Sequence, residues 1–166
     1  MAQKLSETDV LETAEDELSL EAMLGLDDTL MGTFYLTMDA KGRMSFPSKL
    51  REVIGDRFIV TKGLDGCLYV YSCTEFREMT RRLKTKPMAE ARLFSRSFVG
   101  YATVAETDKN GRILIPQALR ECAGLSKDVV VVGVIDRCEI WSKEKWELYN
   151  SDNEDRLAAT LEGLQL

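Results

Sequence analysis

A fifteen-residue segment that occurs twice in the chain decides the fold. MDAKGRMSFPSKLRE spans residues 38–52, and TDKNGRILIPQALRE spans residues 107–121, sixty-nine positions later. Seven of the fourteen positions that begin at the shared aspartate are identical. After one inserted residue the similarity resumes at an offset of 70 and reaches Phe76 and Trp146. Self-similarity at a fixed offset indicates copies of one supersecondary unit, so the chain contains an internal duplication.

Each copy predicts the same series of short elements. The Asp-x-x-Gly sequence is typical of a tight turn, because aspartate caps the backbone and glycine tolerates positive φ. The proline that follows can occupy the first position of a short helix, which then ends at Gly55 or Gly124. β-Rich runs flank these features. The predicted strands are residues 33–38, 43–46, 57–61 and 67–71 in the first copy and 102–107, 112–115, 128–134 and 138–141 in the second.

The segment between the copies, residues 74–97, is predicted to be helical and to be split in two by Pro87. It carries seven basic residues: Arg77, Arg81, Arg82, Lys84, Lys86, Arg92 and Arg96. Charges on a connecting helix usually form a solvated face, and a second phosphate-binding surface is the alternative. The second copy ends in a matching helix from Lys143 to about Asn150. The pattern weakens after Ser151, where a frayed helix is the alternative to an unstructured tail.

Charge is divided unevenly along the chain. Residues 1–30 hold nine acids and one lysine, a net charge of −8, and residues 151–166 contribute −3. Residues 31–150 contain 20 basic and 15 acidic residues, so this central body stands at +5 within a total of −6. Apolar residues recur every four positions in the N-terminal segment, which predicts an acidic amphipathic helix or an arm that folds on contact. A further hypothesis is that residues 7–28 cover the basic body as a DNA mimic, and the alternatives are a loose arm and a partner-binding helix.

Several functional classes are disfavoured by what the sequence lacks. No apolar run approaches the roughly 20 residues of a spanning helix, and no secretory signal is visible, which favours the cytoplasm and no membrane partner. Without any histidine or Cys-x-x-Cys pair, we expect no metal, no other cofactor, and four cysteines that are buried, reduced thiols. Motifs of nucleotide-binding and hydrolytic enzymes are missing, so we expect no catalytic residues and no small-molecule substrate.

The doubled Asp-x-x-Gly-Arg turn, followed by a short strand and a proline-started helix ending in Arg-Glu, resembles the MraZ family over residues 30–150. The resemblance implies an α+β fold. In it, two tandem AbrB-like halves form a pseudo-symmetric β-barrel core with short helices, joined by connecting helices and preceded by an acidic N-terminal extension that family members usually lack. The implied boundaries are 1–29 for the extension, 30–96 for the first repeat with connecting helices, 97–150 for the second repeat with its terminal helix, and 151–166 for the tail.

The resemblance also implies a function. Such a chain is a sequence-specific transcriptional repressor, associated with the nucleoid, that acts on its own division and cell wall gene cluster. It binds double-stranded DNA at short direct repeats of the promoter as a homo-oligomeric ring. The alternatives are a ring scaffold with no DNA role and an AbrB-type antitoxin.

The family's Asp-x-x-x-Arg motif falls on Asp39 with Arg43 and on Asp108 with Arg112. An arginine directly after a tight turn projects from a fixed backbone, and it can pair bidentately with guanine or clamp a phosphate. The residues expected to contact DNA are Arg43, Arg112, Lys41 and Lys109, and those expected to orient the turns are Asp39, Gly42, Asp108 and Gly111. Because Lys109 lies one position earlier in its turn than Lys41, the two copies need not touch DNA identically. The competing interpretation is a surface ion pair that only pins a hairpin.

Overall fold

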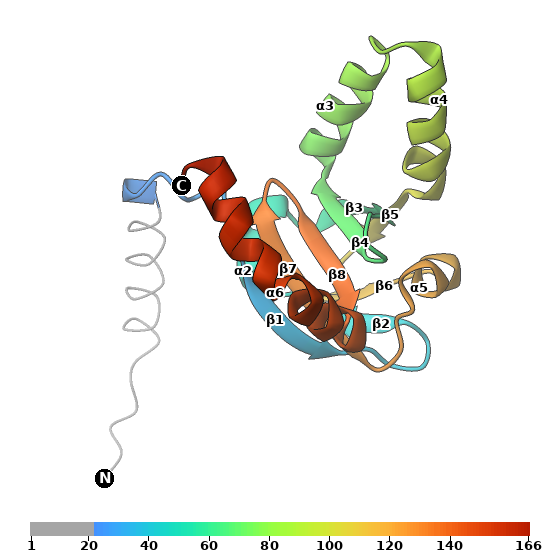
Figure 1. The fold of residues 1–166 in the computed structure, drawn as a ribbon. Helices are drawn as coiled ribbons and strands as arrows, with labels where there is room; N and C mark the ends of the chain where they lie inside the picture. Colours follow the sequence, from blue (N-terminus) through green and yellow to red (C-terminus); the bar gives the residue numbers. More distant parts are fainter. Residues whose placement is uncertain (1–21) are drawn as a thin grey trace.

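A computed structural model describes residues 22–166, which form an antiparallel sheet, a two-stranded ribbon and several helices (Figure 1). The first half contains β1 (Leu30–Thr37), β2 (Arg43–Ser45), α2 (Ser48–Ile54), β3 (Arg57–Lys62), β4 (Leu68–Ser72), α3 (Cys73–Leu83) and α4 (Met88–Ser97). A 3-10 helix, η1 (Val99–Tyr101), leads to the second half, which contains β5 (Thr103–Glu106), β6 (Arg112–Leu114), α5 (Gln117–Ala123), β7 (Asp128–Ile135), β8 (Cys138–Ser142) and α6 (Lys143–Leu164). The eight predicted strands are all present.

The two halves are interleaved within the sheet. Its six strands follow the order β1-β7-β8-β4-β3-β5, and every neighbouring pair is antiparallel. The first strand of each half pairs with the other half: β1 runs beside β7, from Leu30 opposite Ile135 to Thr37 opposite Asp128, and β5 runs beside β3. Neither half can therefore complete its own sheet.

The two short strands that follow the turns form a separate ribbon. β2 pairs with β6, with Met44 opposite Ile113, and an isolated bridge joins Met38 to Met44. Among the described residues no ladder joins the edge strands β1 and β5, so the sheet is open and the closed β-barrel expected from the resemblance is not observed. The physical reason is that β1 and β5 each run into a turn, and the strands that leave those turns pair with each other.

The core repeats the duplication in three dimensions. α2 and α5 each begin directly after a proline, which is the N-cap with an extended ψ and not the first helical residue that was predicted. Both helices bury equivalent leucines, Leu50 and Leu119. Phe46 and Ile115, the residues before the two prolines, are also buried, and the ring centroids of Phe46 and Phe58 lie 4.6 Å apart. Full burial of such a side chain contributes about 1.5–3 kcal/mol, so this shared core holds the halves together.

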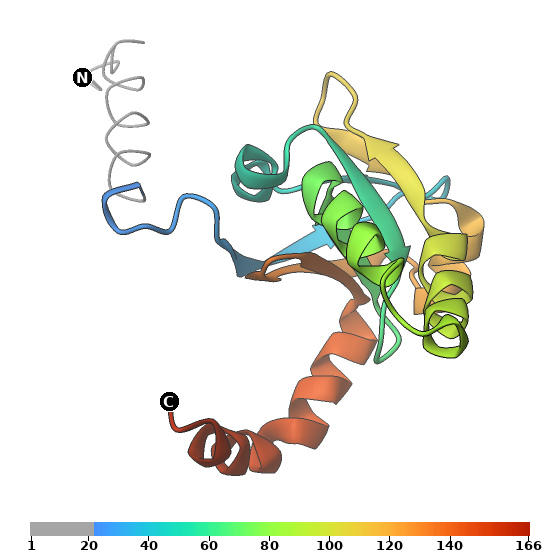
Figure 2. The same cartoon turned by 90° about the horizontal axis from the view of Figure 1, so that it is seen from above.

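The connecting and terminal helices lie outside this core. Pro87 separates α3 from α4, as the sequence predicts. α6 runs to Leu164, well beyond Asn150, where the predicted helix ended. None of its residues is buried, and Figures 1 and 2 show it projecting from the sheet. The start of α6 packs Trp146 against Trp141, but the part beyond Asn150 is almost entirely exposed. A helical segment without a buried face has no amphipathic pattern to detect, although residues 154–162 are mostly good helix formers.

The structure also bears on the expectations for the N-terminal segment, the cysteines and membrane-spanning helices. The predicted N-terminal acidic helix lies mostly in residues 1–21, outside the described residues. Cys67 and Cys138 are buried thiols, but Cys73 and Cys122 are only half-buried, so the expectation of four buried cysteines is wrong for two of them. Between residues 22 and 166, no helix combines the length and the apolar character needed to cross a membrane.

Candidate nucleic-acid interface

The first turn is closed by the side chain of Asp39. Its Oδ1 accepts hydrogen bonds from the backbone N–H groups of Lys41 and Arg43, both at 2.9 Å. The bond from the Arg43 N–H is the main cause that lowers the pKa of Asp39 below its ordinary 3.8, and the nearby guanidinium groups of Arg43 and Arg112 act in the same direction. The charged carboxylate therefore fixes the backbone from which Arg43 projects. Lys41 and Arg43 are both exposed.

The second turn has the same backbone geometry and a different arginine position. Asp108 Oδ1 accepts from the N–H groups of Asn110 at 2.8 Å and Arg112 at 3.0 Å, and the latter bond is the main cause that lowers the pKa of Asp108. Asp108 Oδ2 also lies 3.6 Å from Arg112 Nε. Arg112 is half-buried, whereas Lys109 is exposed. The aspartate thus orients the guanidinium in this turn, while Arg43 makes no ion pair with any residue between 22 and 166.

The two turn glycines connect the halves. Gly42 and Gly111 are buried and have φ values of 88° and 73°, a conformation that glycine adopts without the steric cost of a Cβ. The carbonyl of Gly111 accepts a hydrogen bond from Phe46 N–H at 3.0 Å, and the carbonyl of Gly42 accepts one from Ile115 N–H at 2.8 Å. Each turn is therefore held by the strand that belongs to the other half.

The ribbon brings both arginines to one face. Arg43 pairs with Leu114, and Ser45 pairs with Arg112. Between these two pairs lies the buried pair of Met44 and Ile113. Since side chains alternate along a strand, the outer two pairs point away from the core. Leu114 is 57% exposed. The two Asp-x-x-x-Arg motifs are thus one composite surface, which we call the ribbon face and define as Arg43, Ser45, Arg112 and Leu114. The sequence predicted both arginines and missed that their strands pair, so it did not single out Ser45 and Leu114.

Two further arginines lie beside the turns. Arg51 of α2 and Arg120 of α5 occupy the same position in the two copies of the repeated segment, and both are half-buried. A Cβ built on Gly111 would lie 2.8 Å from Arg51 Nη2, and one built on Gly42 would lie 2.7 Å from Arg120 Nε. The sequence analysis gave these arginines no role beyond their place in the Arg-Glu pair of each short helix. Their identity in both copies was the available signal.

The basic connecting segment lies apart from the ribbon face. In Figure 1 the α3–α4 pair extends upward from β4, whereas β2 and β6 lie at the lower right. Arg81 forms an ion pair with Glu78 on the same helix. Exposed pairs of this kind contribute about 0–1 kcal/mol, which agrees with a solvated face.

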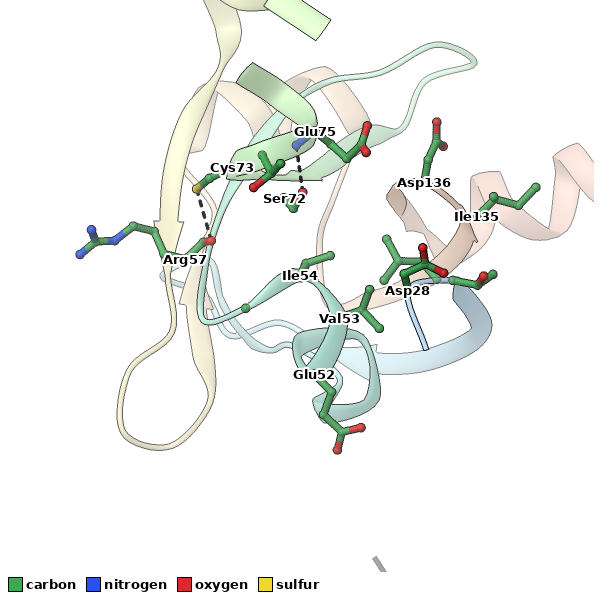
Figure 3. Close-up of a pocket in the computed structure, with 14 residues that line it drawn as sticks. Asp28, Glu52, Val53, Ile54, Arg57, Ser72, Cys73, Glu75, Ile135 and Asp136 are labelled. Atoms are coloured by element: carbon green, nitrogen blue, oxygen red, sulfur yellow. Dashed lines mark hydrogen bonds between the residues drawn. The ribbon is translucent and has the colours of Figure 1, made fainter. Parts of the chain in front are cut away.

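An acidic cavity also lies away from the ribbon face. It has a volume of about 610 Å³, and its lining includes the acidic residues Asp28, Glu52, Glu75 and Asp136. In Figure 3 the guanidinium of Arg57 extends away from the cavity. The hydrogen bonds drawn there are structural: Ser72 Oγ caps α3 by accepting from Glu75 N–H at 3.1 Å, and Cys73 Sγ donates to the Arg57 carbonyl at 3.4 Å. The four carboxylates disfavour the approach of a phosphate group.

The arrangement of the ribbon face is suited to binding a polyanion. Two guanidinium groups stand on a narrow antiparallel ribbon, their backbones fixed by the aspartate bonds and their turns fixed by the opposite half. Planar guanidinium forks held in this way can bind phosphate or the edge of guanine through two parallel hydrogen bonds.

Comparison with known proteins places the chain in a family. A family model described as "MraZ protein, putative antitoxin-like" matches it twice, over residues 29–96 and 98–165. The Transcriptional regulator MraZ of Desulforamulus reducens is 54% identical over 126 residues, which cover 75% of this chain and 89% of the relative. The protein of the same name from Thermoanaerobacter sp. (strain X514) is 47% identical over 142 residues, which cover 82% of this chain and 99% of the relative. Since the family model accounts for both halves and these relatives align over most of their length, the chain belongs to the MraZ family.

Proposed function

We propose that this chain is a sequence-specific DNA-binding transcriptional regulator, a repressor, that reads DNA with the ribbon face. The observation that carries the proposal is that Arg43 and Arg112, one from each half, lie on the same outward side of a two-stranded antiparallel ribbon. The relatives described above are named transcriptional regulators, which supports the same role. The ribbon face offers cations and hydrogen-bond donors, so we propose binding and no catalysis.

The ribbon has a shape that the major groove of B-DNA admits. A guanidinium held at a fixed position can donate two parallel hydrogen bonds to O6 and N7 of guanine, and such a pair contributes about 1–3 kcal/mol of discrimination against a wrong base. Ser45 can bond to a base edge, and Leu114 can contact a thymine methyl group. Lys41 and Lys109, at the tips of the turns, would bind phosphates and set the position of the ribbon along the duplex.

One chain alone would bind DNA weakly, because residues 31–150 carry a net charge of only +5. We propose that the chain forms a homo-oligomeric ring that places several ribbon faces on short direct repeats in the promoter of its own division and cell wall gene cluster. Linking two weak sites can raise the overall affinity by about 10²- to 10⁴-fold. This activity would place the protein on the nucleoid, in the cytoplasm.

The test is a titration of the purified chain against two labelled duplexes, one from the region upstream of its own gene and one with that sequence scrambled. We compare the wild type with Arg43→Ala/Arg112→Ala. A matched control, Arg81→Ala/Arg92→Ala, removes the same charge from α3 and α4. We expect the ribbon variant to lose its preference for the upstream duplex, with a salt slope lower by up to about two, while the control keeps the preference.

The assembly state of each variant is measured by light scattering, so that loss of binding is not confused with loss of the oligomer. If the ribbon variant keeps the wild-type preference, the ribbon face is not the DNA reader. If the wild type binds neither duplex, and still binds neither after removal of residues 1–29, the proposed function is wrong. A ring scaffold or an antitoxin would then be the better interpretation.

A further inference from the structure

A helix arginine of the first half is packed on the turn of the second half. Arg51 donates from Nε to the carbonyl of Phe46 at 3.2 Å. Phe46 in turn donates its N–H to the carbonyl of Gly111 at 3.0 Å. The end of the Arg51 guanidinium also lies against Gly111, since all three atoms nearest to a Cβ built there belong to it. Arg51 is therefore linked to the second turn by one relayed pair of hydrogen bonds and by direct packing.

The second half repeats this arrangement toward the first turn. Arg120 donates from Nε to the carbonyl of Ile115 at 3.0 Å, and Ile115 donates its N–H to the carbonyl of Gly42 at 2.8 Å. A Cβ built on Gly42 would lie 2.7 Å from Arg120 Nε. The same contact thus occurs twice, and in both cases it crosses from one half to the other.

We propose that Arg51 and Arg120 are positioning residues that orient the DNA-reading arginines across the halves, with Arg51 acting on Arg112 and Arg120 acting on Arg43. The inference rests on the proposed function of the ribbon face and names residues that determine its geometry. Each positioning guanidinium packs on the glycine directly before the reading arginine, so its displacement changes the backbone from which that arginine projects.

Arginine has the chemistry that this position requires. Its Nε donates to the carbonyl at the end of the ribbon strand, while its flat guanidinium covers the bare Cα of the turn glycine. A lysine keeps the positive charge, but its compact ammonium group cannot do both at once. Arg→Lys is therefore a substitution that keeps the positive charge and removes the guanidinium that makes these contacts.

The second turn has an additional support that the first turn lacks. Arg51 Nη1 also lies 3.5 Å from Asp56 Oδ1, and Asp56 accepts from the hydroxyl of Thr107 at 3.2 Å, directly before the second turn. The Asp56 carbonyl accepts from Thr107 N–H at 2.9 Å, and the equivalent bond before the first turn runs from Met38 N–H to the carbonyl of Lys127 at 2.7 Å. Lys127 thus occupies the place that Asp56 has before the second turn, and it has no carboxylate. The second turn is therefore held by one more side chain than the first.

Amide hydrogen exchange in the free, full-length chain tests the positioning role without DNA. We expect Arg51→Lys to speed exchange of the second-turn amides about tenfold and to leave the first-turn amides unchanged, because only the second turn loses a support. Arg120→Lys should give the reverse pattern. Arg57→Lys, an exposed arginine paired with Glu106, is the matched control and should change neither turn. If each substitution loosens the turn of its own half, or loosens neither turn, the inference is wrong.

A double-mutant cycle on DNA affinity provides a readout that a merely structural role would not give. With the upstream duplex as probe, we expect Arg51→Lys to weaken binding about tenfold in the wild-type background and in Arg43→Ala. In Arg112→Ala we expect no further loss, because the arginine that Arg51 orients is gone. Equal losses in both backgrounds, or coupling to Arg43 in place of Arg112, would overturn the inference.

Failure of the proposed function would look different from failure of this inference. If the ribbon face does not read DNA, Arg43→Ala and Arg112→Ala leave the affinity for the upstream duplex unchanged. The exchange pattern in the free chain then still decides whether each arginine positions the turn of the opposite half.

Discussion

Replacing Gly42 by alanine is expected to destabilise the chain more than replacing its counterpart Gly111. Both glycines have positive φ, which costs an L-residue about 1–2 kcal/mol. The two sites differ in what an added Cβ would meet. At Gly42 it would lie 2.7 Å from the carbonyl oxygen of Ile115 and 2.7 Å from Arg120 Nε, whereas at Gly111 all three of the nearest atoms belong to the guanidinium of Arg51.

The difference in neighbours sets the expected magnitudes. The Ile115 carbonyl belongs to buried backbone and cannot move without disturbing the ribbon, whereas the end of an arginine side chain can shift. Overpacking against fixed atoms adds about 1–3 kcal/mol. We therefore expect a loss in the free energy of unfolding of about 2–5 kcal/mol for Gly42→Ala and about 1–2 kcal/mol for Gly111→Ala. A domain of ordinary stability has about 5–15 kcal/mol in total, so the first loss is large.

The assay is urea unfolding followed by circular dichroism, with the slope of each transition checked against the wild type. Two further variants make the comparison sharper. Arg51→Ala should relieve part of the cost of Gly111→Ala, whereas Arg120→Ala should leave most of the cost of Gly42→Ala, because the Ile115 carbonyl remains. Equal costs at the two glycines, or a larger cost at Gly111, would show that this backbone contact does not set the penalty.

Three other outcomes are expected. Since Asp39 and Asp108 have lowered pKa values in the folded chain, their contribution to stability is present above pH 3.8 and is lost as the pH falls below it. With asparagine at both positions, the midpoint of unfolding should depend less on pH in the acid range. Burial raises the pKa of the Cys67 thiol, and it raises the pKa of the Cys138 thiol to about 12. Both thiols should therefore react with Ellman's reagent at pH 8 only as fast as the chain unfolds. Rapid reaction of either thiol in the folded chain would contradict this burial. Removing residues 1–29, which carry a net charge of −8, should raise affinity for the upstream duplex at low salt, with the gain shrinking as salt is added, and unchanged affinity would rule out the DNA-mimic hypothesis.

Local features of the fold could be predicted because their signals are local. The Asp-x-x-Gly turns, the prolines that start α2 and α5 and the glycines that end them all act within a few residues. Pro87 likewise separates α3 from α4. The duplication was visible because the second copy repeats these signals in the same order.

The pairing of strands could not be predicted, because it depends on contacts between residues far apart in the chain. Nothing near Arg43 indicates that its strand pairs with the strand of Arg112, and this pairing unites two separate motifs in one ribbon face. The same pairing diverts β2 and β6 from the sheet, which is why the expected barrel is not closed. Arg51 and Arg120 were overlooked for a related reason, since each contacts the turn of the opposite half.

Photocrosslinking from the ribbon face tests most directly whether this surface meets DNA. A photoreactive benzoylphenylalanine replaces Leu114, which is 57% exposed on the ribbon, or Leu93, which is 70% exposed on α4. Each variant is irradiated with the labelled upstream duplex and with the scrambled one. We expect a covalent adduct with the upstream duplex from position 114 and none from position 93. An adduct from position 93 alone would show that the DNA lies on another surface and that the ribbon face does not read it.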